Sequence, residues 1–160
     1  VRRTCGGIDE FISTNDVDFG GIFNMVTFFS FAEDVFRYGS GKKLMLAAPA
    51  VVSNISLEAI KYLELMPKEK TFGIDIQRLL TPHGELMVTK HNLLEGDTNG
   101  KRAYVIDLDN VGYRFLKGRD TKLKTNIQDN DKDARKDEYL TEFGFVRVQE
   151  KTHGRIKNAA

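Results

Sequence analysis

The stretch Gly39-Ser-Gly-Lys-Lys-Leu-Met-Leu-Ala-Ala-Pro49 joins three predicted elements and decides the fold class. Its glycines are typical of a helix C-terminus, and they predict that a helix opened by Gly20-Gly21 ends near Tyr38. The apolar run Leu44–Ala48 then predicts a strand buried on both faces. Pro49 suits the first turn of a second helix. The order helix, strand, helix indicates an α/β layer.

The helix predicted before this stretch is rich in aromatic residues. Its apolar positions fall on two nearly opposite faces, one with Ile22, Met25, Val26, Phe29, Ala32 and Phe36, the other with Phe28, Phe31, Val35 and Tyr38. Because only a narrow polar stripe remains, we expect this helix to be sandwiched between layers. Its phenylalanines indicate core packing rather than a cofactor box.

The second helix is predicted to be divided. Ser53 or Ser56 offers a cap for a further segment that runs through Leu65, and Met66-Pro67 ends it.

The chain beyond the second helix is rich in β patterns. The turn signal Pro82-His-Gly84 separates the strand patterns Phe72–Gln77 and Glu85–Thr89, which predicts a hairpin. Further along the chain we expect an exposed loop and then two strands that flank Asp109-Asn110: Glu95–Gly100, Ala103–Leu108 and Val111–Leu116.

The last third of the chain begins with a charge-dense stretch, Arg119–Glu138, which leads into a strand-like run, Tyr139–Val148. Within it, Asp120–Asp137 has almost no apolar anchors and predicts a mobile or locally ordered loop rather than core. Such an excursion suits an extended arm that stays soluble before it meets a partner, and it suits a catalytic pocket poorly.

Composition narrows the classes of protein. The chain has 160 residues, 41% of them hydrophobic, with 24 basic and 23 acidic residues and a net charge of +1, which predicts one ordinary globular domain. This balance disfavours a nucleic-acid groove.

Cys5 is the only cysteine, so an internal disulfide and a cysteine metal site are excluded. The longest apolar tract, Ile22–Phe36, is broken by polar residues, so no membrane partner is predicted. Since the chain begins at Val1, we expect it to be the later part of a longer polypeptide.

Two glycine–lysine stretches, Gly39–Lys43 and Gly96–Lys101, could suggest a phosphate-binding loop. Neither has the spacing Gly-x-x-x-x-Gly-Lys-Ser/Thr between a strand and the following helix.

Asp129-x-Asp131-x-Asp133 resembles the start of a calcium loop. The glycine at its sixth position and its final glutamate are both missing, so a solvated loop is predicted.

The histidines do not predict a metal site. His83 and His91 are eight residues apart on one predicted strand, about 26 Å if extended, and His153 is isolated near the C-terminus. No serine or cysteine nucleophile has a supporting partner. We therefore predict no catalytic, cofactor-binding or metal-binding residues, no cofactor and no enzyme activity.

Several segments in order resemble the later half of a tailed-bacteriophage major capsid protein. They are the Ile22–Tyr38 helix, then Gly39–Ile55, Thr71–Leu86, Tyr104–Val111 and Thr141–Ile156. Each motif alone is weak, but their order and spacing together are fairly specific, and the resemblance covers essentially the whole chain.

The resemblance implies an α+β phage coat-protein fold, with an axial α/β domain and part of a peripheral β-sheet domain. Residues 1–116 would be mainly the axial domain at the capsomer centre. Residues 117–160 would supply peripheral strands and a returning C-terminal tail. The family's N-terminal arm, extended loop and spine helix would precede this region of the polypeptide.

The resemblance also implies a structural role. The partners would be copies of the chain itself, as pentamers and hexamers of the full-length protein, with scaffolding and portal proteins, and packaged DNA held only non-specifically. The location would be the virion, and the host cytoplasm during assembly. Two alternatives stay open: a nanocompartment shell, and a small α/β nucleotide-binding enzyme domain that uses the Gly39–Lys43 loop, for which nucleotides would raise the melting temperature.

Overall fold

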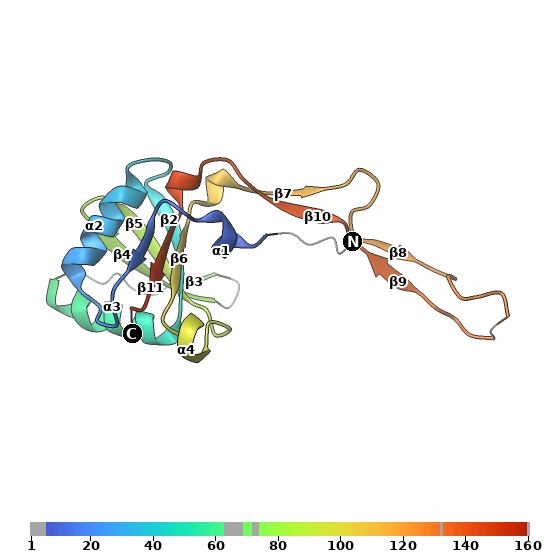
Figure 1. Cartoon of the computed structure of the whole chain (residues 1–160), viewed down its shortest axis with the longest axis horizontal. Helices are drawn as coiled ribbons and strands as arrows, with labels where there is room; N and C mark the ends of the chain where they lie inside the picture. Colours follow the sequence, from blue (N-terminus) through green and yellow to red (C-terminus); the bar gives the residue numbers. More distant parts are fainter. Residues whose placement is uncertain (1–5, 63–68, 72–73, 132, 160) are drawn as a thin grey trace.

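The computed structural model describes residues 6–62, 69–71, 74–131 and 133–159. These residues form a mixed α+β body and a long arm that projects from it (Figure 1). The fold class predicted from the sequence is therefore confirmed. Some residues named in the predictions lie outside the described residues: Val1, Cys5, Leu65, Met66, Pro67, Phe72 and Gly73.

The body is built on a seven-stranded mixed sheet. Its strands, in spatial order, are β1 (Asp16–Asp18), β11 (Gly154–Lys157), β6 (Ala103–Ile106), β2 (Lys42–Ala47), β5 (Gly84–Lys90), β4 (Ile74–Thr81) and β3 (Glu69–Thr71). The central strand β2 runs parallel to β5 and antiparallel to β6. The predicted strand Leu44–Ala48 is thus present, but only one face of it is completely buried, because the side chains of Leu44 and Leu46 on the other face are half-covered.

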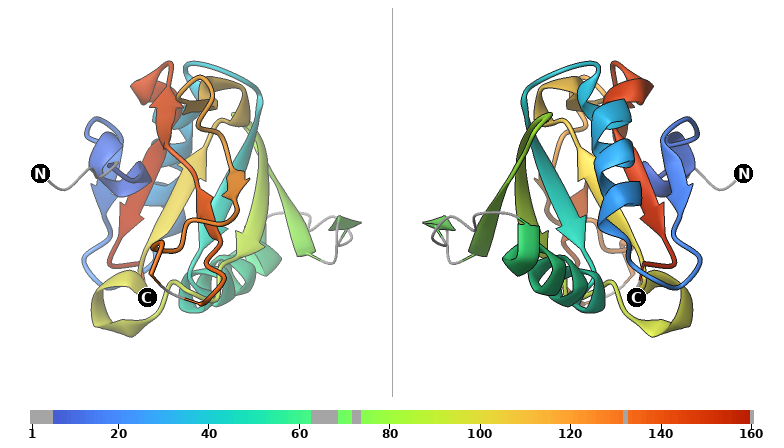
Figure 2. Two further views of the ribbon diagram at one scale, coloured as in Figure 1. Left: turned by 90° about the vertical axis from the view of Figure 1, so that its right-hand side faces the viewer. Right: turned by 90° about the vertical axis from the view of Figure 1, so that its left-hand side faces the viewer.

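Helices α2 (Met25–Phe36) and α3 (Pro49–Tyr62) cover one face of this sheet, while the short α1 (Ile8–Phe11) and the arm lie on the opposite side (Figure 2). The core forms where α2 and α3 meet the sheet. Gly154 in β11 lets α2 approach closely, because a Cβ at this position would lie 2.6 Å from the Phe31 ring. Within the described residues no helix is both long and apolar enough to cross a membrane.

Helix α2 differs from its prediction in two ways. It begins after Asn24, whose side chain accepts a hydrogen bond from the Val26 amide, rather than at Gly20-Gly21. It is also buried along one stripe only, and Val26 and Ile22 are 76% and 77% exposed, so the predicted sandwich is wrong. The buried positions repeat at three- and four-residue spacing, which is the pattern of a helix packed on one side: Met25, Phe28, Phe31, Ala32 and Val35.

Helix α3 begins at Pro49, as predicted, but it is continuous through Tyr62. Neither serine caps a new segment. The Ser53 hydroxyl donates to the Pro49 carbonyl and the Ser56 hydroxyl to the Val52 carbonyl, one helical turn back. These hydroxyls are satisfied within the helix, which is why it continues through them.

The predicted hairpin is confirmed as β4 and β5, which pair from Ile76 with Thr89 to Thr81 with Gly84. The Thr81 hydroxyl both donates to the Gly84 carbonyl and accepts from its amide, which closes the two-residue turn. The expected loop Glu95–Gly100 is exposed but contains one helical turn, α4 (Gly96–Asn99).

The arm consists of two consecutive antiparallel ribbons (Figure 1). β7 (Val111–Phe115) pairs with β10 (Phe143–Arg147), and further out β8 (Lys122–Lys124) pairs with β9 (Glu138–Leu140). The predicted run Tyr139–Val148 is therefore not one strand. It breaks at Thr141-Glu142, where the Glu142 carboxylate pairs with Arg119 at 2.5 Å and its backbone bonds to Leu116 and Arg119.

Candidate functional site at the base of the arm

The arm joins the body through two short 3-10 turns, η1 (Leu108–Asn110) and η2 (Glu150–Thr152). We define the arm base as residues 107–110 and 148–153. The outgoing and returning chains meet where the Val148 amide donates to the Asn110 carbonyl at 2.9 Å. The two chains that connect the arm to the body are therefore bonded to each other at the arm base.

Lys43 anchors the arm base from the central strand β2. Its side chain is completely buried, and its ammonium donates to the carbonyls of Val35 (3.0 Å), Tyr38 (2.9 Å) and Thr152 (2.7 Å). The last turn of α2, the segment that follows it and the end of η2 are thus bound to one cation. Burial lowers the pKa of Lys43, and the nearby Asp107 carboxylate opposes this shift.

Asp107 is the buried partner of Lys43, at 3.6 Å. Its carboxylate accepts hydrogen bonds from the Ser40 amide, the Asn110 side chain and the Asp109 amide. Burial raises the pKa of Asp107, but these hydrogen bonds and the Lys43 ammonium outweigh burial and leave the pKa below its usual value. The carboxylate is therefore ionised and fixes the start of the outgoing chain.

Gly39 gives the Asp107 carboxylate its space. It has a φ of +84°, and a Cβ at this position would collide with Asp107 Oδ2 and lie 2.8 Å from a Thr152 methyl group. The glycine that ends the first helix pattern is thus also required by the arm base.

His153 lies on the returning side and is only 4% exposed. Its Nδ1 accepts a hydrogen bond from the Asp107 amide at 3.2 Å, and its carbonyl accepts one from the Asn15 side chain. Burial lowers the pKa of His153, Asp107 opposes this, and Lys43 and Arg147 lower it further. The ring is therefore neutral, with its proton on Nε2, at neutral pH.

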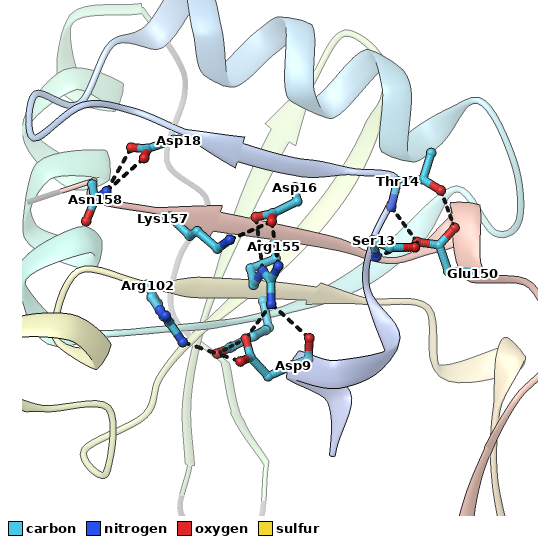
Figure 3. Close-up of polar contacts among 11 residues, drawn as sticks. Asp9, Ser13, Thr14, Asp16, Asp18, Arg102, Glu150, Arg155, Lys157 and Asn158 are labelled. Atoms are coloured by element: carbon cyan, nitrogen blue, oxygen red, sulfur yellow. Dashed lines mark hydrogen bonds and ion pairs between the residues drawn. The ribbon is translucent and has the colours of Figure 1, made fainter. Parts of the chain in front are cut away.

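A second polar network holds the N-terminal segment on β11 (Figure 3). The Arg155 guanidinium bonds to Asp16 (2.5 and 3.0 Å) and to Asp9 (2.7 Å), and Lys157 bonds to Asp16 at 2.6 Å. The hydrogen bond from Arg155 is the main reason that the pKa of Asp16 is lowered. This network replaces a longer strand pairing, because β1 has only three residues.

Glu150 in η2 binds the same N-terminal segment. It accepts from the Ser13 amide (2.8 Å), the Thr14 amide (2.7 Å) and the Thr14 hydroxyl (2.5 Å). Burial raises the pKa of Glu150, but these hydrogen bonds outweigh it and lower the pKa to about 2. The N-terminal segment is therefore bound to the arm base as well as to the sheet.

The arm presents an exposed aromatic face. Tyr113 lies 5.9 Å from Phe115 and 5.3 Å from Phe143, measured between ring centroids, and all three side chains are more than half exposed. This face continues toward the body, where Phe145 stacks on Phe11 at 5.9 Å. A two-stranded ribbon is marginal by itself, so such a surface is typical of a segment that meets a partner.

The candidate phosphate, metal and calcium ligands named in the sequence analysis do not lie together in one site. Lys43 of the glycine–lysine stretch points into the body, so it is not available to a nucleotide. His83 and His91, predicted to lie on one strand, lie just beyond opposite ends of β5. Asp129, Asp131 and Asp133 are exposed on the arm. Among the described residues no group of three or more His, Cys, Asp or Glu side chains could hold a metal ion.

Sequence reasoning missed the cluster of Lys43, Asp107 and His153. One signal was available, because Lys43 occupies the same face of its strand as Met45 and Ala47. A lysine in phase with the buried residues of a central strand indicates a buried cation that needs partners.

The family model described as SU10 major capsid protein matches residues 1–160. No curated protein sequence matches the chain.

Among solved structures, the chain is similar to the holo-SrpI encapsulin complex from Synechococcus elongatus PCC 7942, with a TM-score of 0.64 and 11% identity. The match covers 96% of this chain and 56% of the encapsulin chain, so this chain spans about half the length of its structural relative. At this identity the likeness shows the shared coat-protein fold alone.

Proposed function

The chain belongs to the SU10 major capsid protein family, and we propose that it is a structural coat subunit of a tailed bacteriophage. The observation that carries the proposal is the family match over all 160 residues. Its location is the capsid of the virion, and the host cytoplasm during assembly.

The architecture supports this role. A shell subunit needs a rigid body, a projecting element that reaches its neighbours, and a stable joint between them. The sheet with α2 and α3 provides the body, the two ribbons provide the projection, and the buried Lys43–Asp107 pair lies at the joint.

We propose that residues 1–116 are mainly the axial domain and that residues 117–160 are peripheral strands with a returning tail. The division between body and arm supports this assignment, with two refinements. β7, which begins at Val111, would join the peripheral part because it pairs with β10. β11 would belong to the axial sheet, since it lies between β1 and β6.

The proposed partners are copies of the chain, in pentamers and hexamers of the full-length protein. Scaffolding and portal proteins would be further partners during head assembly. A net charge of +1 supports only weak, non-specific contact with packaged DNA.

The test is expression of the complete coding sequence without other virion proteins, followed by sedimentation and negative-stain electron microscopy. Closed particles are expected. The 160-residue chain alone is expected to be a monomer or a small oligomer whose size depends on concentration. A complete coding sequence that stays monomeric under every assembly condition would contradict the capsid role.

A second candidate is a protein nanocompartment shell, which the similarity to an encapsulin supports. Both candidates predict closed particles, so their contents separate them. Particles purified from the natural source contain DNA that nuclease cannot reach if the protein is a phage coat. They contain a defined cargo protein and no protected DNA if it is a nanocompartment.

A further inference from the structure

We propose that His153 is a pH-sensitive latch that fixes the arm to the body when its ring is neutral and releases the arm when the ring is protonated. The inference concerns the isolated chain and does not depend on the capsid role.

The latch connects the two chains of the arm base. His153 follows η2 on the returning side, and its Nδ1 accepts from the backbone amide of Asp107, which precedes η1 on the outgoing side. Protonation places a hydrogen on Nδ1, so two donors then face each other across 3.2 Å. The hydrogen bond between the two sides is lost and becomes a repulsive contact.

The surroundings leave the protonated ring little compensation. Nε2 is buried and has no hydrogen-bond partner among the described residues, although the Asn110 backbone lies near enough to favour the cation. His153 and Arg147 line one small cavity of about 10 Å³, whose other walls are apolar side chains of α1, β6, β7 and β10. Nη1 of Arg147 is also buried and has no hydrogen-bond partner in the part of the chain that the structure describes.

The charged groups that face His153 come from three elements. Lys43 of β2 and Arg147 of β10 disfavour a second cation, and Asp107 favours one. Asp107 is already engaged by Lys43, by two backbone amides and by the Asn110 side chain. Wall residues Phe11 of α1 and Val111 of β7 are apolar and offer no acceptor side chain.

Acid should weaken the latch, because the pKa of His153 is lowered in the folded chain. The ordinary pKa of a histidine is 6.5, and that of His153 lies below it in the folded chain. The unfolded or opened chain therefore binds a proton first, and the latch loses stability as the pH falls below about 6.5. The arm base should open in mildly acid solution while the rest of the sheet stays folded.

The test measures the distance between the body and the arm by electron spin resonance. Spin labels are placed at Ser53→Cys in α3 and Arg114→Cys in β7, both exposed, in a Cys5→Ser background. The distance distribution should be narrow at pH 8 and broaden by about twofold or more at pH 5. Circular dichroism at both pH values monitors the body.

Two variants test the role of the ring. His153→Asn keeps an acceptor near the Asp107 amide but cannot titrate, so its distribution should stay narrow at both pH values. Arg147→Gln removes a neighbouring cation, so the folded pKa of His153 moves back toward its ordinary value. Protonation then destabilises the latch less, and broadening should be weaker at pH 5 and begin at lower pH than in the parent chain. His83→Asn, an exposed histidine in the hairpin turn, is the matched control and should behave like the parent.

A parent chain whose distribution does not change between pH 8 and pH 5 overturns the proposal. So does equal broadening in His153→Asn. If His153→Asn fails to fold, the Arg147→Gln variant decides, because a midpoint that does not move, or moves to higher pH, contradicts a latch at His153.

Discussion

The Lys43 ammonium lies 3.6 Å from the Asp107 carboxylate, and both side chains are completely buried between the central sheet and the arm base. The pair joins three distant parts of the chain, because Lys43 also bonds to the last turn of α2 and to η2. Buried ion pairs are seldom a large net source of stability, but removal of one partner leaves the other charge uncompensated. The first prediction rests on this asymmetry.

Lys43→Met should lower the free energy of unfolding by about 3–5 kcal/mol, because it leaves the buried Asp107 charge and three backbone carbonyls without their donor. Lys42→Met is the matched control in the neighbouring position. The Lys42 side chain is 69% exposed and pairs with Glu85 at the surface, so its loss should cost less than about 1 kcal/mol. Urea denaturation of both variants measures the difference, and equal losses would argue against the buried pair as an anchor.

Gly39→Ala should destabilise the chain more than Gly20→Ala. Both glycines have positive φ, so each alanine has a conformational cost of about 1–2 kcal/mol. Only at Gly39 does the new Cβ collide with a carboxylate, whereas at Gly20 the space is open. We expect an additional cost of about 1–3 kcal/mol at Gly39. Thermal unfolding of the two variants checks this, and the same melting temperature for both would contradict the close approach of Asp107.

Glu150→Gln should change how stability depends on acid. Because the folded pKa of Glu150 is about 2 against an ordinary 4.5, its carboxylate stabilises the fold above pH 4.5 and loses this effect as the pH falls toward 2. The variant should be less stable at pH 7 by about 1.5–3 kcal/mol. Its free energy of unfolding should also fall less steeply than that of the parent as the pH drops. The exposed Glu95, whose side chain forms no cap, gives the control Glu95→Gln. Urea titrations from pH 7 to pH 3 supply both curves, and parallel curves would refute the role of Glu150.

Much of the body was predictable because its signals are local. Pro49 marks the start of α3, and the Pro82-His-Gly84 turn marks the β4–β5 hairpin. The predicted start of α2 at Gly20-Gly21 is wrong because the helix begins after Asn24, whose side chain caps it. The prediction that α2 is sandwiched between layers was wrong because apolar residues such as Val26 are exposed in the isolated chain.

The arm base was not predictable from local pattern. His153 and Asp107 are 46 residues apart in the sequence. Their contact depends on the return of the chain from the arm to the central sheet, which periodicity does not reveal. The pairing of β1 with β11 was missed for a similar reason, since Asp16-Val-Asp18 is too short and too acidic to indicate a strand.

The outer arm should be the first part of the chain that a protease cuts. Residues in β8 and β9 are mostly exposed, and the loop between them carries Arg135 and Lys136 in exposed positions. Brief trypsin treatment followed by mass spectrometry should therefore find the first cuts between Lys122 and Lys136. First cuts within β5 instead would mean that the arm is protected or that the body is less stable than its packing indicates.

The last prediction concerns the aromatic face of the arm. Tyr113, Phe115 and Phe143 contact one another but are each more than half exposed, so they contribute little to the stability of the isolated chain. The variant Phe115→Ser/Phe143→Ser should change the free energy of unfolding of the 160-residue chain by less than about 1 kcal/mol. Introduced into the complete coding sequence, it should lower the yield of closed particles severalfold, since shell contacts rely on apolar surface that the subunit alone leaves exposed.

Leu93→Ser is the matched control for this prediction, because Leu93 is 81% exposed on the body and lies apart from the arm in the chain. Sedimentation of the parent, the arm variant and the control at equal concentration measures the fraction in particles. Loss of particles in the arm variant alone locates an assembly contact on the aromatic face. Equal yields in all three would show that assembly does not use this face, and a large loss of stability in the isolated arm variant would show that the aromatic cluster serves the fold of the subunit itself.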